Sequence, residues 1–381
     1  MINSPLPKIK NHFTKRKYLY LLTFLCLLQI FLTGQADLSN YDPNHDVISY
    51  RKMAIALPSI DYSVGKPFAH RLLAPWLVGF FFNDVDLGFT LFNTLFSTIF
   101  ILTLFYFLQQ NRISERIAFF ITAVFIFNRY FIPGFAYEPY RFADVLSNLM
   151  LLLSLIFIVK RKYLLVLILS VVGILARENA IAIIPVGLAF ILLNNQKKGL
   201  LKFVFVSATL IAVFITIRVL IPVEQGISLT QAFTENWTKI FSFEAIAKQF
   251  FLAFNPLFLI PFFSYKEFFA FNKNNHHWLV LLIFVIFASL FGGDKERLMF
   301  AYAPIYYLFM AVIFQKLEDA LKIETTTFIA ILVICWIANL HHIWGLIKLP
   351  SREISLAFAI AGGIIMLIIY LRLIKERITI N

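Results

Sequence analysis

Residues that could carry transfer chemistry are gathered in a few short polar stretches of an otherwise apolar chain. The longest stretch, residues 35–71, contains four aspartates and ends on a histidine and an arginine: Asp37, Asp42, Asp46, Asp61, His70 and Arg71. Three shorter stretches add charged residues further along: Glu138 and Arg141, Arg177 and Glu178, and the run Asp294, Lys295, Glu296 and Arg297. A carboxylate can take a proton from an attacking hydroxyl, and arginine or lysine can stabilise a phosphate that leaves. These residue types suit a reaction that needs both functions.

The rest of the chain has the composition of an integral membrane protein. It is 60% hydrophobic and 14% charged, with a mean hydropathy of +0.80, whereas soluble domains contain about 25% charged residues. A helical span needs about 20 apolar residues, so 381 residues leave room for ten to twelve spans. The sequence therefore predicts one all-α, polytopic integral membrane domain over residues 1–381, with about twelve transmembrane helices.

Apolar runs give the positions of these spans. After a first span at 18–34, a surface helix is expected to begin near residue 72, with a span from about 87 to 108 following it. The other predicted spans are 113–132, 142–159, 163–176, 180–194, 201–221, 249–264, 278–291, 299–315, 326–344 and 354–371. The pair 163–176 and 180–194 is short for two crossings, which predicts tilted or re-entrant helices there.

The basic residues carry a topology signal. The net charge is +13, but lysine and arginine occur in short clusters between apolar runs, at 8–17, 160–162, 197–202 and 372–377. Cytoplasmic loops carry such clusters, and this pattern argues against a nucleic-acid partner. Residues 1–17 are therefore expected to be a cytoplasmic N-terminus, and 35–71 the first extracytoplasmic loop. An even number of spans places both termini in the cytoplasm and the protein in the plasma, or inner, membrane.

Motifs of soluble enzymes are absent. The sequence has no phosphate-binding loop, dinucleotide fingerprint, serine-hydrolase elbow or spaced cysteine and histidine ligands. Each charged stretch taken singly has the composition of an ordinary interface anchor. Charged groups within a membrane cost about 2.5 to 3.5 kcal/mol each, so they persist where they pair or line an aqueous cavity. Their occurrence on one predicted face favours a shared site.

Four segments resemble the GT-C superfamily of membrane glycosyltransferases, in particular its bacterial branch without a defined substrate. They are HDVISYRKMA at 45–54, PFAHRLLAPWLVG at 67–79, LARENAIAIIP at 175–185 and GGDKERLMFAYAP at 292–304. Such enzymes use polyprenyl-phosphate sugars as donors and an acidic residue of the first loop as catalytic base. The resemblance implies sugar transfer from such a donor to an acceptor on the extracytoplasmic face, with Asp46 as the first choice of base and Asp42 as the second. The loop lacks the adjacent pair of acidic residues found in these enzymes.

The remaining charged positions are assigned by type and predicted side. Arg297, Lys295 and Arg177 are expected to bind the donor phosphate. The other residues expected to line the site are Asp37, His70, Arg71, Glu138, Arg141, Glu178 and Asp294. Asp42 and Asp46 are of the type that ligates a divalent cation, but their spacing does not demand one, and no other cofactor is expected. The expected partners are the polyprenyl-phosphate sugar donor, membrane lipid, and a glycan, lipid or protein acceptor that the sequence leaves open.

Two alternatives use the same topology. A polytopic carrier commonly has twelve spans with both ends inside, and its site lies near the bilayer midplane. Asp144, within the predicted span 142–159, would be central to such a carrier. A polymerase or ligase of surface polysaccharides would share the lipid-linked substrate, but it need not use a base from the first loop.

Overall fold

A computed structural model describes most of the chain and is all-α there. The described residues are 12–35, 45–128, 131, 137–223, 233–234, 250, 253–254, 257–288, 295–321, 323–338, 357, 360–365, 367–368 and 370–372. Within these ranges the chain forms helices and no β-strand. This confirms the predicted all-α class.

Among the described residues, five helices are long and apolar enough to cross a membrane, as expected for a multi-pass membrane protein. They lie within α1 (His12–Thr33), α4 (Val85–Gln110), α6 with the turn before it (Phe142–Val159), α9 (Lys197–Leu220), and α16 with the turns before it (Ala303–Leu321). Shorter apolar helices are α7 (Tyr163–Ala176), α8 (Ile183–Leu193), α14 (His276–Ala288) and α17 (Thr325–Ala338). The predicted span at 249–264 is described only in part, without residues 249, 251–252 and 255–256, so the count of twelve stays a prediction.

The predicted surface helix and the span after it are both present. They are α3 (Leu73–Phe81) and α4, separated by a short turn. Asp84 ends this turn, and its Oδ1 accepts hydrogen bonds from the backbone N–H groups of Asp86 (3.1 Å) and Leu87 (3.0 Å). An aspartate at this position satisfies N–H groups that the first turn of a helix leaves free, and it therefore fixes where α4 begins.

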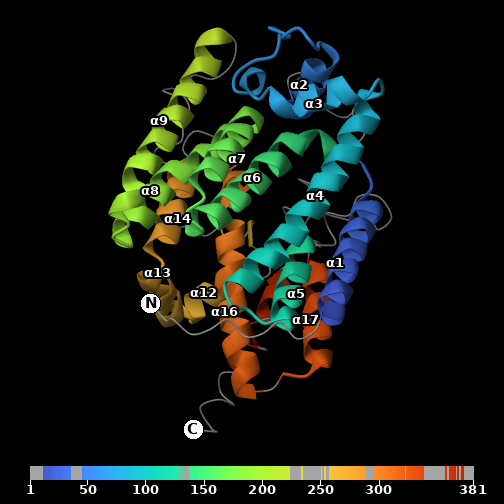
Figure 1. The fold of residues 1–381 in the computed structure, drawn as a ribbon. Coiled ribbons are helices and arrows are strands. Elements are labelled where there is room, and N and C mark those ends of the chain that lie inside the picture. Colours follow the sequence, from blue (N-terminus) through green and yellow to red (C-terminus); the bar gives the residue numbers. More distant parts are fainter. Residues whose placement is uncertain are drawn as a thin grey trace.

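In the described part of the chain, helices also form outside the predicted spans. The helix α2 (Asp46–Ile55) forms within the predicted first loop, and it lies beside α3 at the upper end of the bundle in Figure 1. The helix α13 (Tyr265–Asn274) precedes α14. The remaining described elements are α5 (Glu115–Ile126), α12 (Ile260–Phe263), α15 (Lys295–Met299) and the 3-10 turns η2 (Phe68–His70), η4 (Pro139–Arg141), η5 (Glu178–Ala182), η6 (Leu257–Leu259) and η8 (Phe300–Tyr302).

A charged break separates α7 from α8. The two helices have 14 and 11 residues, or about 21 and 17 Å at 1.5 Å per residue, less than the roughly 30 Å of a bilayer core. The predicted shortness of this pair is confirmed. Between them, Arg177 has an extended backbone and η5 follows directly. Because α7 packs along α6, this break lies beside the first turns of α6.

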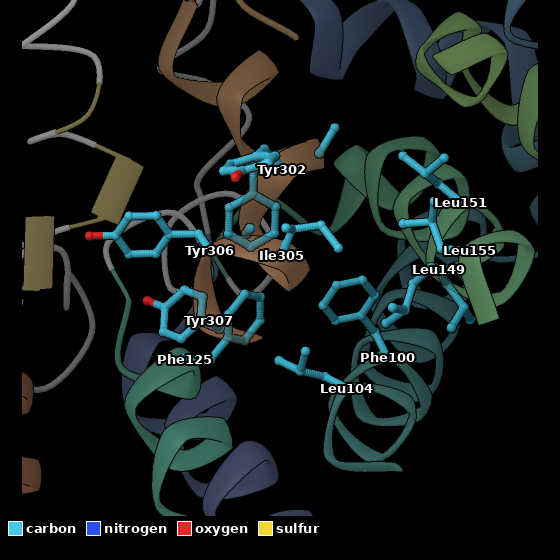
Figure 2. Close-up of a cluster of buried hydrophobic side chains, with 14 of the residues drawn as sticks. Phe100, Leu104, Phe125, Leu149, Leu151, Leu155, Tyr302, Ile305, Tyr306 and Tyr307 are labelled. Atoms are coloured by element: carbon cyan, nitrogen blue, oxygen red, sulfur yellow. The ribbon is translucent and has the colours of Figure 1, made fainter. Parts of the chain in front are cut away.

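An aromatic core holds α16 in the middle of the bundle. Phe125 of α5 contacts the rings of Phe300 and Tyr307, and these residues are almost completely buried. Figure 2 shows this core, in which α16 side chains face Phe100 and Leu104 of α4 and leucines of α6. Burial of these side chains fixes α15 and η8, which directly precede α16, against the ends of the neighbouring helices.

The opposite end of the bundle is joined by a separate polar contact. Arg116, in the first turn of α5, donates to Glu318 of α16 (2.7 Å), to the carbonyl of Ile323 (2.9 Å) and to Thr325 of α17 (3.1 Å). This arginine therefore ties three helices together at the end remote from α2 and α3 (Figure 1).

Candidate active site

Asp46 is the first residue of α2, and two guanidinium groups and an imidazole surround its carboxylate. Its Oδ2 lies 2.5 Å from Nη1 of Arg297 and 3.8 Å from Nε of Arg141. Its Oδ1 lies 2.9 Å from Nδ1 of His45 and accepts from the N–H of Val47 at 3.0 Å. The residue is only 8% exposed. Helix α2 thus presents a buried carboxylate to the segment before α16.

The charges around Asp46 decide its protonation. Burial by itself raises the pKa of Asp46, but the hydrogen bond from His45 and the charges of Arg141 and Arg297 outweigh it. Together they hold the pKa well below the usual range of an aspartate. Asp46 is therefore ionised, and it is a weak base as long as these partners stay in place.

Arg297 continues the network to the ends of the apolar helices α6 and α7. Its Nε lies 3.5 Å from Oδ2 of Asp144 in the first turn of α6, and Oδ1 of Asp144 pairs with Nη1 of Arg177. Asp144 is 1% exposed and Arg177 is 3% exposed. Ser147 donates from Oγ to the backbone carbonyl of Arg177 at 3.2 Å, which fixes the α7–η5 break against α6. Asp46, Arg297, Asp144 and Arg177 form one continuous row of alternating charge.

A second ion pair joins the first loop to the break between α7 and η5. Arg71 donates from Nε and Nη2 to the two oxygens of Glu178, at 2.9 and 2.5 Å. Its Nη1 donates to the hydroxyl of Tyr50 at 2.7 Å. Tyr50 follows Asp46 by four residues and so lies on the same face of α2. The bidentate geometry makes this the strong form of an arginine–carboxylate contact.

Helix α2 also makes an ion pair with the start of α4. Arg51 donates to both oxygens of Asp86 at the start of α4 (2.7 and 3.1 Å), and Tyr140 of η4 donates to the same carboxylate at 3.0 Å. Arg141, the next residue, pairs with Glu138. Contacts on two sides therefore set the position of α2.

The structure brings together most of the predicted site residues that it describes. Those in the cluster are Asp46, Arg71, Glu138, Arg141, Arg177, Glu178 and Arg297. His70 makes a different contact, because its Nε2 lies 3.1 Å from the carbonyl of Ile221 at the end of α9. Asp37, Asp42 and Asp294 lie outside the described residues, and of Lys295 only the backbone, in α15, is described.

Three residues of the cluster were not among the predicted site residues. In the sequence analysis Asp144 was a feature of the carrier alternative only, and His45 and Tyr50 were part of the segment 45–54 without a role of their own. The signal for Asp144 was its position three residues after Arg141, in the first turn of an apolar helix. The signal for Tyr50 was its spacing from Asp46, which became informative only once α2 was known to be a helix.

The described cluster neutralises its own charge. Four carboxylates, Asp46, Glu138, Asp144 and Glu178, face four guanidinium groups, those of Arg71, Arg141, Arg177 and Arg297. Buried charges are tolerated only when they are paired in this way. Among the described residues, no three histidine, cysteine, aspartate or glutamate side chains lie together as a metal site would require.

Comparisons with known proteins give no assignment: no protein-family model, curated protein or solved structure matches the chain. The geometry and chemistry of the cluster are therefore the basis for inferring function.

Proposed function

We propose that this protein is a GT-C-type glycosyltransferase that moves a sugar from a polyprenyl-phosphate donor to an acceptor on the extracytoplasmic face. One observation carries the proposal. The carboxylate of Asp46, on a helix of the first loop, lies within 2.5 Å of Arg297, which joins it to Asp144 and Arg177 at the ends of apolar helices. A base and phosphate-binding groups are thus adjacent, at the end of a bundle suited to a membrane.

The transfer divides between these residues as follows. The acceptor hydroxyl oxygen attacks the anomeric carbon, and Asp46 takes the hydroxyl proton. The bond from the anomeric carbon to the phosphate oxygen breaks, and its electron pair leaves with the polyprenyl phosphate. Arg297 and Arg177 stabilise the negative charge that accumulates there. A phosphate leaving group carries this charge without taking a proton.

The membrane-facing surface of the bundle suits a lipid-linked substrate. Helix α9, which packs along α7 and α8, exposes Leu201, Phe205 and Val219 along its length, each by more than 60%. Exposed apolar surface of this extent belongs in lipid rather than in water. A polyprenyl chain can lie against such a surface while its phosphate reaches the charged cluster.

The charge distribution supports an extracytoplasmic site. Asp144 and the basic turn at 160–162 lie at opposite ends of α6. Sixteen residues of helix separate Asp144 from Lys160, about 24 Å, which approaches the thickness of a bilayer core. Because basic turns favour the cytoplasm, the cluster is assigned to the outer side.

A carrier is the second candidate, and the buried Asp144–Arg177 pair beside a broken helix favours it. Carriers bind substrates and ions at broken helices. The contacts that Asp46 and Arg71 of the first loop make with this pair and its neighbours favour the transferase, because a midplane site would not need them. A polysaccharide polymerase or ligase would use the same donor and differ in its acceptor.

The test uses purified full-length protein in liposomes that contain a panel of polyprenyl-phosphate sugars. We expect release of polyprenyl phosphate together with transfer of the sugar from at least one donor, and loss of both in Asp46→Asn. A carrier would instead move a solute across the membrane and leave every donor intact. If no donor is bound or cleaved, the proposed function is wrong.

A further inference from the structure

Arg297 uses two edges of its guanidinium group on two different carboxylates. Nη1 lies 2.5 Å from Oδ2 of Asp46. Nε lies 3.5 Å from Oδ2 of Asp144. The first partner belongs to a loop helix, and the second is a nearly inaccessible residue of an apolar helix. The two contacts can therefore change independently.

The contact to Asp144 is the fixed one. The second oxygen of Asp144 is engaged by Arg177, and the backbone of Arg177 is held by Ser147. Asp46, by contrast, keeps another partner if Arg297 turns away, because Nδ1 of His45 lies 2.9 Å from its other oxygen. Loss of the Arg297 contact would therefore leave neither carboxylate isolated.

Building on the proposed function, we propose that the donor phosphate competes with Asp46 for the Nη1 edge of Arg297. Asp144 keeps hold of the Nε edge throughout and is a positioning residue. Donor binding then frees Asp46 to accept a proton, so the base becomes active only when the sugar donor is in place. We call this step the Arg297 exchange.

The exchange explains why the described part of a site for an anionic substrate is electrically balanced without that substrate. A phosphodiester brings one negative charge, and the guanidinium group that would bind it, that of Arg297, is already paired with Asp46. The groups that face Asp46 are His45 from its own helix start, Arg141 from η4 and Arg297 from α15, with Tyr50 and Asp144 nearby. Removal of the nearest guanidinium from this set raises the affinity of Asp46 for a proton.

The test measures binding of methyl polyprenyl phosphate, a phosphodiester of fixed single charge that carries no transferable sugar, to the full-length protein in nanodiscs. The exchange predicts that Asp46→Asn binds this probe more tightly than the wild type, by about fivefold or more, although it cannot catalyse transfer. In Arg297→Ala the probe binds weakly, and addition of Asp46→Asn to this variant brings no gain.

A matched control separates the exchange from a general change of charge. Asp86→Asn removes one negative charge at the same end of the bundle, where the carboxylate pairs with Arg51 and not with Arg297. The exchange predicts no tightening in this variant. Equal tightening in Asp86→Asn, or a gain from Asp46→Asn that persists without Arg297, would overturn it.

The wild-type protein provides a second measurement should Asp46→Asn fold poorly. Because the freed carboxylate gains affinity for protons, binding of the probe takes up protons as the pH falls, as measured by calorimetry in buffers of different ionisation enthalpy. Binding without proton uptake contradicts the exchange and leaves the proposed function standing if sugar transfer is observed. Absence of both probe binding and sugar transfer would instead defeat the proposed function.

Discussion

In the proposed mechanism, Asp46 is the base, and its contact with Arg297 keeps it a weak base until the donor binds. Asn keeps its shape and can still accept a hydrogen bond, but it cannot take up the hydroxyl proton. We expect Asp46→Asn to lower the rate of sugar transfer by about 100-fold to 10,000-fold, while the protein stays folded and membrane-inserted. Single-turnover transfer with saturating donor, alongside thermal unfolding, measures both properties.

Asp42→Asn is the informative companion to this variant, since Asp42 is the other candidate base and lies outside the described residues. Normal turnover in Asp46→Asn with loss in Asp42→Asn would move the assignment to Asp42. Normal turnover in both variants would count against the enzyme class.

Arg297 should not tolerate a change to lysine, although the charge is kept. Its guanidinium contacts Asp46 through Nη1 and Asp144 through Nε, and a single ammonium group cannot reproduce this planar fork. We expect Arg297→Lys to weaken donor binding by about tenfold or more, on the scale of lost charge-assisted hydrogen bonds.

Arg116→Lys is the control for this prediction, because Arg116 also makes several hydrogen bonds, to Glu318, Ile323 and Thr325, at the other end of the bundle. That variant should lower the unfolding temperature and leave donor affinity intact. The same pattern in Arg297→Lys would reduce Arg297 to a structural anchor.

The sequence predicted some residues of the charged cluster and missed others, for a physical reason. Charge type and predicted side identified Arg177, Glu178 and Arg297, which the structure places in one cluster. The same sidedness argument set Asp144 apart, because it lies inside an apolar run. Its ion pairs depend on how α6, the α7–η5 break and α15 pack, and no local pattern carries that information.

At the level of elements, the position of α2 depends on a close approach to α3. A Cβ atom added at Gly79 would meet the backbone carbonyl of Ala54, so the two helices could not keep their present spacing. We expect Gly79→Ala to destabilise the protein by about 1 to 3 kcal/mol. Transfer should fall as well, because Asp46 moves with α2, and this effect should persist in assays well below the unfolding temperature.

Gly199→Ala is the control for the close packing. The three atoms nearest to a Cβ there belong to the side chain of Tyr163 and not to backbone, and the position is remote from α2. Unchanged stability and transfer in Gly79→Ala would show that the α2–α3 contact does not position Asp46.

Helix boundaries were predictable where a long apolar run ends on charge. The bounds of α7 (Tyr163–Ala176) match the prediction from 163 to 176, because basic residues at 160–162 precede the run and Arg177 follows it. The helix α2 has no such run. It is stabilised by burial of Val47, Tyr50 and Met53 and by its ion pairs, which are tertiary effects, and residues 45–54 were therefore not predicted as a helix.

At the scale of the whole molecule, the two ends of α6 are expected to lie on opposite sides of the membrane, with the charged cluster at one end. Helix α2, which directly precedes the segment leading to α3, lies next to η4 at the end where α6 begins, and the turn at 160–162 lies where α6 ends. The 18 residues of α6 span about 27 Å. Two probes placed on these two segments should therefore lie on opposite sides of the membrane.

Cysteine labelling of intact cells measures this directly. We expect Tyr62→Cys, at an exposed position between α2 and α3, to react with a membrane-impermeant maleimide from outside. Lys162→Cys, exposed in the turn after α6, should react only after permeabilisation, because its basic cluster favours the cytoplasm. The natural cysteines, Cys26 and Cys335, are buried and serve as a silent background. Labelling of both variants from one side would contradict the arrangement of α6 across the membrane, and labelling in the reversed order would place the charged cluster in the cytoplasm, where extracytoplasmic transfer could not occur.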